Sequence, residues 1–163
     1  MNKIGLALAQ TRSAEATLAD AWLRVGERQS VDQEWLYNGR HFRGQCLSHI
    51  DDLTRFAPKY DASVDSKEDN EFFQRLKGKA RHTVSMLIGR RPESGLVLMR
   101  DQRMLFTLGY ATSFHWIVLG QVAQASRDHD LLTMVDHNHK EILTQIKWLK
   151  TEIKSVAPQV LCS

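Results

Sequence analysis

The chain has 163 residues, of which 42% are hydrophobic and 25% charged, and its formal net charge is +3. These values are ordinary for one globular domain with its own hydrophobic core. No run of about 18 apolar residues is present, which argues against a membrane span. The N-terminal residues also lack the apolar core of a signal peptide.

The cysteine count and the charge pattern exclude two further classes. The two cysteines, Cys46 and Cys162, are too few for a disulfide framework, so we expect a cytoplasmic protein. Basic and acidic residues alternate along most of the chain, which gives little support for nucleic-acid binding.

The first part of the chain predicts two antiparallel helices. Residues 2–27 carry apolar residues spaced alternately by three and four positions, the pattern of a helix that buries one stripe. Glu15 lies in the middle of this stripe, where an aliphatic residue would be the usual choice. Ser30, with a glutamine three residues later, is a capping-box pattern that predicts a second helix over 31–57, which ends before Pro58. Beside its apolar stripe runs a polar one that either borders the core or faces water. Its members are His41, Gln45, His49 and Asp52.

The last part of the chain predicts two further long helices, over 96–124 and 129–156. Both repeat the alternate spacing of apolar residues, and the short join between them predicts a second antiparallel hairpin. Each stripe contains one histidine, His115 in the first helix and His139 in the second. The pattern predicts that both histidines point into the core.

A long crossover, over 58–95, separates the two hairpins and carries a helix of its own at about 71–88. The expected fold is therefore all-α, a single four-helix-bundle domain over residues 1–163. Two antiparallel hairpins joined by a long crossover resemble the ferritin-like superfamily, and the resemblance extends over about residues 4–156.

The ferritin-like resemblance implies a metal site in the bundle core. Metal-binding members of that superfamily hold two iron or manganese ions with a glutamate from each of two helices and a Glu-x-x-His pair from each of the others. Glu15 matches the first-helix glutamate, and Asp136 with His139 has the spacing of a Glu-x-x-His pair. The implied metal ligands are Glu15, His49, His115, Asp136 and His139. A donor set this poor in carboxylates favours one transition-metal ion over an oxo-bridged pair, with iron, zinc or manganese as the candidate cofactors.

Two interpretations of the function remain open. In the first, the chain is a metal-binding or redox protein, and any catalysis is that of a metal-dependent oxidoreductase. In the second, the polar core residues form a hydrogen-bonded Glu–His network without a metal, and the bundle is an oligomerising or protein-interaction scaffold. In both we expect a homodimer, because bundles of this type commonly pair.

Overall fold

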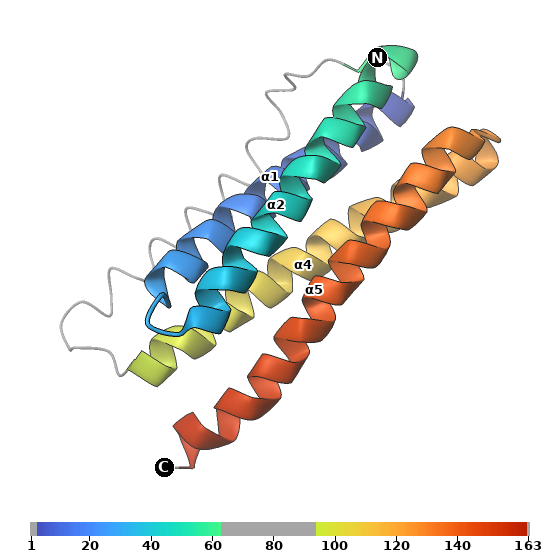
Figure 1. Ribbon diagram of the computed structural model, residues 1–163. Coiled ribbons are helices and arrows are strands. Elements are labelled where there is room, and N and C mark those ends of the chain that lie inside the picture. The colour runs from blue at the N-terminus through green and yellow to red at the C-terminus, as the bar shows by residue number, and fades with distance from the viewer. Residues whose placement is uncertain (1–2, 63–93, 163) are drawn as a thin grey trace.

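The computed structural model describes residues 3–62 and 94–162, and within these residues the chain is helical and has no β-strand (Figure 1). Its long helices are α1 (Lys3–Arg28), α2 (Gln33–Phe56), α4 (Ser94–Ala125) and α5 (His129–Leu161), and a short 3₁₀ helix, η1 (Ala57–Tyr60), follows α2. The prediction of an all-α chain with four long helices is confirmed. The helix predicted over 71–88 lies outside the described residues. No helix in the described ranges is long and apolar enough to cross a membrane.

Local sequence explains where most of these helices begin and end, and seven of the eight ends lie within two residues of the prediction. The N-cap of α2 is Asp32 rather than Ser30, and its carboxylate accepts a hydrogen bond from the backbone N–H of Glu34. The exception is α5, which continues past 156 and includes Pro158. The last turn of α5 packs on the start of α4, a contact between distant residues that local periodicity does not predict.

The helices form two antiparallel hairpins that pack on each other (Figure 1). α1 packs against α2 and α4, and α5 packs against α4 and α2, so the four helices form a ring. At one end of the bundle, Arg28 pairs with Asp101 near the start of α4 at 2.6 Å. At the other end, Lys59 pairs with Asp128 before α5 at 2.7 Å. Helices α2 and α4 therefore run in the same direction, and the connection between them joins opposite ends of the bundle.

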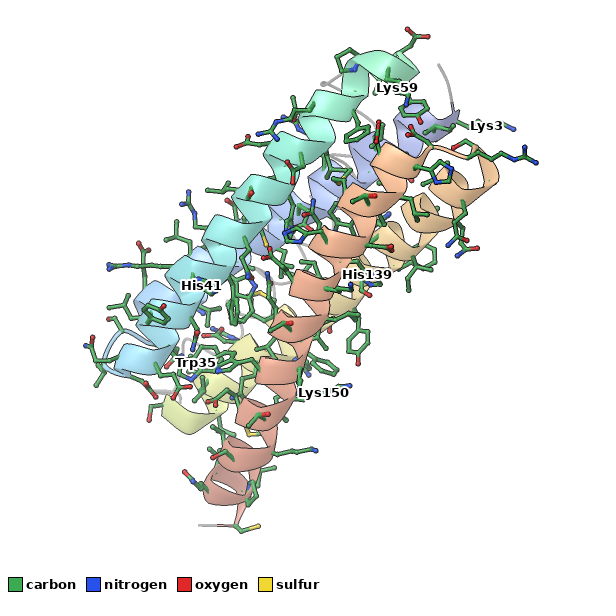
Figure 2. All side chains as sticks on the ribbon, turned by 45° about the vertical axis from the view of Figure 1, so that its right-hand side comes forward. Lys3, Trp35, His41, Lys59, His139 and Lys150 are labelled. Carbon is green, nitrogen blue, oxygen red and sulfur yellow. The ribbon has the colours of Figure 1, made fainter. Side chains whose placement is uncertain are left out.

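Aromatic side chains fill the core where the two hairpins meet. The Trp22 and Phe42 rings lie 4.8 Å apart, and the Trp35 and Trp148 rings meet edge to face at the same distance. Such tilted pairs are the favourable geometry for aromatic rings. Trp35 lies near the α1–α2 turn, between the hairpins (Figure 2). Because α1, α2 and α5 all contribute rings to this cluster, it fixes the two hairpins to each other.

Most members of the stripes predicted for α4 and α5 are buried, but both stripes differ from the structure at their histidines. On α4 Trp116 is fully buried, whereas the neighbouring His115, which was predicted to point inward, is only half-buried. On α5 the buried residue is Asn138, and His139 beside it is half-buried. Neighbouring helix positions point about 100° apart, so a shift of one residue moves a side chain from the centre of the core to its border.

Candidate functional site in the bundle core

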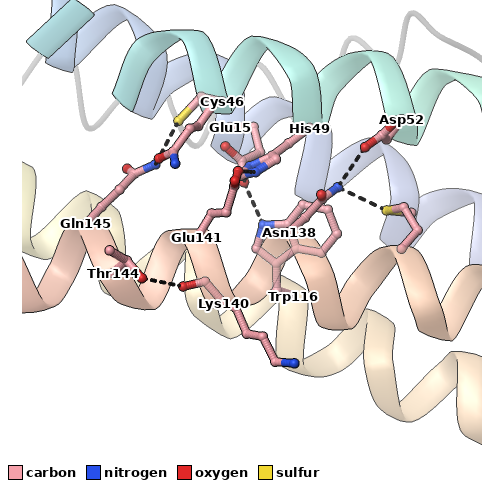
Figure 3. Close-up of polar contacts among 12 residues, drawn as sticks. Glu15, Cys46, His49, Asp52, Trp116, Asn138, Lys140, Glu141, Thr144 and Gln145 are labelled. Carbon is pink, nitrogen blue, oxygen red and sulfur yellow. Dashed lines mark hydrogen bonds and ion pairs between the residues drawn. The ribbon is translucent and has the colours of Figure 1, made fainter. Parts of the chain in front are cut away.

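The carboxylate of Glu15 is buried at the centre of the bundle, with no exposed surface. Trp116 on α4 donates its indole N–H to Glu15 Oε1 at 2.6 Å. The Nδ1 atom of His49 on α2 lies 3.1 Å from the same oxygen (Figure 3). Three helices therefore meet at one carboxylate oxygen. The burial of Glu15 agrees with its place in the apolar stripe of α1.

His49 lies between two carboxylates. Its Nδ1 faces Glu15, and its Nε2 lies 2.8 Å from Oε2 of Glu141 on α5 (Figure 3). An ionised carboxylate only accepts hydrogen bonds, so each ring nitrogen needs a proton to bond its neighbour. Burial alone would lower the pKa of His49, but the hydrogen bonds and charges of Glu15 and Glu141 raise it above its ordinary value. The arrangement favours an imidazolium held from both sides.

The charges of this triad (Glu15, His49 and Glu141) are arranged according to burial. Glu15 and His49 are both buried, and together they form a neutral pair, which reduces the cost of removing either charge from water. The third member, Glu141, keeps 31% of its side chain exposed and is partly solvated. The triad therefore places its unbalanced negative charge where water reaches it.

Two further polar residues, Gln145 and Asn138, extend the line of polar contacts along α5. Gln145 accepts a hydrogen bond from the indole N–H of Trp22 at 2.8 Å and donates to Gln45 at 3.1 Å. On the other side of Glu141, the amide of Asn138 donates to Asp52 at 3.3 Å (Figure 3). Positions 138, 141 and 145 follow helical spacing, so α5 presents one polar stripe to the first hairpin.

The second oxygen of Glu15, Oε2, is buried and has no hydrogen-bond partner among the described residues. The nearby Cys46 thiol is also fully buried. Burial, followed by the Glu15 charge, raises the pKa of Cys46 well above its ordinary range. The thiol is therefore held in its protonated form, which is a poor nucleophile and a poor metal ligand.

The five predicted metal ligands fall into two groups. Glu15 and His49 meet in the triad. The other three, His115, Asp136 and His139, lie at the border of the bundle or on its surface. His139 projects from α5 toward α4, where its Nε2 lies 2.8 Å from the hydroxyl of Ser113 (Figure 2). Burial lowers the pKa of His139, with a smaller opposing effect from Asp136, so the neutral ring is favoured there.

Two residues of the site were not predicted from the sequence, namely Glu141 of the triad and Trp116, which donates to Glu15. Trp116 directly follows His115, and an indole on a helix is ordinarily read as a packing residue. Glu141 lies next to Ile142 of the apolar stripe and resembles a solvated residue. The available signal was the spacing of Asn138, Glu141 and Gln145, which places three polar residues on one face of α5.

The donor set does not fit the metal centre that the ferritin-like resemblance implies. A metal-bound imidazole offers an unprotonated nitrogen to the ion, whereas both nitrogens of His49 face carboxylate oxygens. The indole of Trp116, which cannot ligate, contacts Glu15 directly. Within residues 3–62 and 94–162, no group of three or more histidine, cysteine, aspartate or glutamate side chains has a geometry that could hold a metal ion.

The chain was also compared with protein-family models, with curated proteins and with solved structures, and none of the three comparisons found a match.

Proposed function

We propose that this chain is a metal-free scaffold of the ferritin-like type, whose function is to assemble with other copies of itself. The core triad supports the metal-free part of the proposal, because hydrogen bonds already occupy both ring nitrogens of His49 and one carboxylate oxygen of Glu15. The directions of the helices support the ferritin-like part, because α2 and α4 run parallel and need a connection along the bundle.

The observation that carries the assembly function is the outer face of α4. This face exposes Tyr110 (44%), Phe114 (61%) and Ile117 (51%), close together on one helix. Residues 104–126 contain no aspartate, glutamate, lysine or arginine, so no charge interrupts the face. A helix that is apolar all round is normally buried on every side. An exposed apolar patch of this kind marks a protein contact.

Metal binding is the second candidate function, and the unpartnered Oε2 atom of Glu15 favours it. A buried carboxylate oxygen without a donor is costly, and a cation beside it would offset that cost. For metal binding, the predicted cofactors are iron, zinc or manganese. The activity would then be that of a ferritin-like oxidoreductase.

Elemental analysis and mass measurement on the same purified protein separate the two functions. We expect no stoichiometric metal as isolated or after incubation with iron, zinc or manganese, and a mass above that of one chain by light scattering. About one metal ion per chain, lost in both Glu15→Ala and His49→Ala, would establish metal binding instead. A single-chain mass across the micromolar range would contradict the assembly function.

A further inference from the structure

We infer that two copies of this chain pack through the outer face of α4, with the two α4 helices antiparallel and the two-fold axis beside Phe114. This inference rests on the proposed assembly function and adds its place, direction and symmetry. Helix α4 carries a second stripe, opposite the one that faces the core. The members of this outer seam are Thr107, Tyr110, Phe114, Ile117, Gln121 and Gln124, all of which are exposed.

The spacing of the outer seam is that of helices that pack side by side. Its members are separated by three, four, three, four and three residues. This alternation keeps a line of side chains facing one partner helix, with knobs seated in the holes of the partner. A scattered set of exposed apolar residues would not show it, and such residues need no partner. The outer seam is therefore a helix-packing surface without a partner in the chain's described residues.

The order of side chains along the seam favours an antiparallel two-fold pairing. Phe114 lies at the centre, with one large apolar residue on each side, Tyr110 before it and Ile117 after it. Beyond these come polar residues at both ends, Thr107 and Gln121. The seam is thus apolar at its centre and polar at both ends, so its pattern is nearly the same in either chain direction. In a two-fold antiparallel pair each end of the seam meets the opposite end of the same surface.

The lack of charge argues for a second copy rather than a different protein. In a two-fold pair only the residue on the axis faces its own copy, so a charge at Phe114 would face a like charge, and a charge elsewhere in the seam would need an opposite charge at the position that it meets. The seam has none between Arg103 and Arg127, which are the nearest charged residues of the segment. Complementary charges of the kind that select a different protein are therefore absent from the seam.

The size of the surface agrees with a dimer of modest strength. Stable interfaces take about 800 Å² from each partner. The partly exposed aromatic and aliphatic side chains of the seam supply roughly 300–500 Å² of this. The polar ends of the seam and the exposed Lys150 of α5 would form the solvated rim. Lys150 already lies over the Tyr110 ring, with its Nζ 5.5 Å from the ring centroid, and holds that ring in place.

Sedimentation of seam variants tests the location. We expect the parent to be a dimer and Phe114→Lys or Ile117→Lys to weaken dimerisation at least a hundredfold, because Phe114→Lys places like charges at the axis and Ile117→Lys buries a charge without a partner in the apolar centre of the seam. Leu47→Lys is the matched control, since Leu47 is an exposed apolar residue on α2 and should leave the dimer intact. All three residues are exposed, so the substitutions should leave the fold intact, and circular dichroism of each variant checks this.

Cysteine crosslinking tests the direction and the axis. In a Cys162→Ser background, which removes the one exposed thiol of the described residues, Phe114→Cys should crosslink to its own copy under mild oxidation. Thr107→Cys alone should not do so, but it should crosslink when mixed with Gln121→Cys chains. Self-crosslinking of Thr107→Cys would indicate parallel helices and overturn the inference.

The outcomes separate this inference from the function on which it rests. A dimer that survives both lysine substitutions would overturn the α4 interface and leave the assembly function standing. A parent that remains a single chain at all concentrations would overturn both.

Discussion

The central residue of the bundle is His49, whose ring separates two carboxylates. A buried ion pair gains attraction in a medium of low polarity but loses hydration, and the two effects nearly cancel. Removing one partner is different, because it leaves the other charge buried and alone. The two carboxylates that pair with His49 differ in burial. Glu15 is fully buried, whereas Glu141 reaches water.

Replacing His49 should therefore destabilise the bundle far more than replacing Glu141. We expect His49→Gln to lower the free energy of unfolding by about 3–5 kcal/mol, because the Glu15 carboxylate loses its cationic partner while still buried. Glu141→Gln should cost about 1 kcal/mol or less, since the lost pair is partly exposed. Urea denaturation of the parent and the two variants measures both. Equal losses in the two variants would show that the burial of Glu15 does not govern the energetics of the triad.

The raised pKa of His49 makes stability depend on pH. Burial opposes protonation of His49, but Glu15 and Glu141 outweigh it, so the folded chain binds this proton more tightly than the unfolded chain. The stabilisation is complete below the unfolded pKa of about 6.5. It is lost as the pH rises through the higher folded pKa.

A pH series of urea denaturations isolates this effect by comparing the parent with His49→Gln. The parent should lose stability, relative to the variant, as the pH rises above about 6.5. His139 acts in the opposite sense, because its pKa is lowered and its contribution grows as the pH rises, but it is present in both proteins. The Cys46 thiol, whose pKa is raised, stays protonated over this range. Parallel curves for the two proteins would show that folding does not raise the pKa of His49.

How far the sequence predicts the site depends on how unusual each residue is in its setting. Glu15 was predictable because a glutamate interrupts an aliphatic stripe, and burying it demands a partner. His115 and His139 interrupt their stripes in the same way, yet both lie at the border of the core. A stripe several residues wide leaves the rotation of a helix uncertain by about one position, which is about 100°. Only packing between the hairpins selected Trp116 and Asn138 as the buried neighbours.

At the scale of elements, α1 and α2 approach each other closely through their backbones. A Cβ atom added to Gly39 would lie 2.8 Å from Gly26 Cα and 2.9 Å from the carbonyl oxygen of Trp22. These are backbone atoms, which cannot move aside as a flexible side chain would. The two glycines let the helices approach closely beside the turn that joins them, and the paired lack of side chains fixes the register of the first hairpin.

Two alanine substitutions on α2 should therefore change stability in opposite directions. Gly39→Ala should destabilise by about 1–3 kcal/mol, because the new methyl group pushes α1 and α2 apart. Gly44→Ala meets nothing within 4 Å and should stabilise by about 0.5–1 kcal/mol, because alanine has the higher helix propensity. Thermal unfolding of the two variants beside the parent gives both values. A stabilised Gly39→Ala would mean that the helices are free to separate there.

The elements themselves were largely predictable, because helix length and ends depend on local features that the sequence displays. Alternate apolar spacing, Pro58 and the short joins suffice for α1, α2 and α4. The end of α5 depends instead on a contact between distant residues. Val160 lies so close to Gly95 that an added Cβ would be 2.6 Å from its Cγ2. Pro158 has no N–H to bond the carbonyl of Lys154, so α5 lacks that one backbone hydrogen bond close to its end.

At the scale of the whole molecule, an acidic residue at each end ties the first hairpin to the second. Asp101 accepts hydrogen bonds from Arg28 at 2.6 Å and from Gln29 at 3.2 Å. At the opposite end, Asp128 accepts from Lys59 and from the hydroxyl of Tyr60. The core triad lies between these ends, so its geometry depends on both hairpins being held in register along their full length.

Asp128 has two roles, and losing it should affect both. It is the N-cap of α5, accepting from the backbone N–H of Leu131 at 3.2 Å, and its side chain is only 7% exposed. Hydrogen bonds from Lys59 and Tyr60 lower its pKa from 3.8 to about 2. Burial, together with Asp128, raises the pKa of Tyr60 to about 12. We expect Asp128→Ala to lower the free energy of unfolding at pH 7 by about 2 kcal/mol.

The acid dependence of this loss identifies its source. A carboxyl with a lowered pKa stabilises the fold above its unfolded value near 4, and this contribution disappears as the pH falls toward 2. The gap between parent and Asp128→Ala in urea denaturation should therefore narrow over that range, leaving only the part that a protonated cap retains. Asp130→Ala is the matched control, since Asp130 is exposed in the first turn of the same helix and should cost less than about 0.5 kcal/mol. If the difference in free energy of unfolding between parent and Asp128→Ala stays constant down to pH 2, the loss comes from packing. The ionised Asp128 carboxylate between the hairpins would then not contribute to stability.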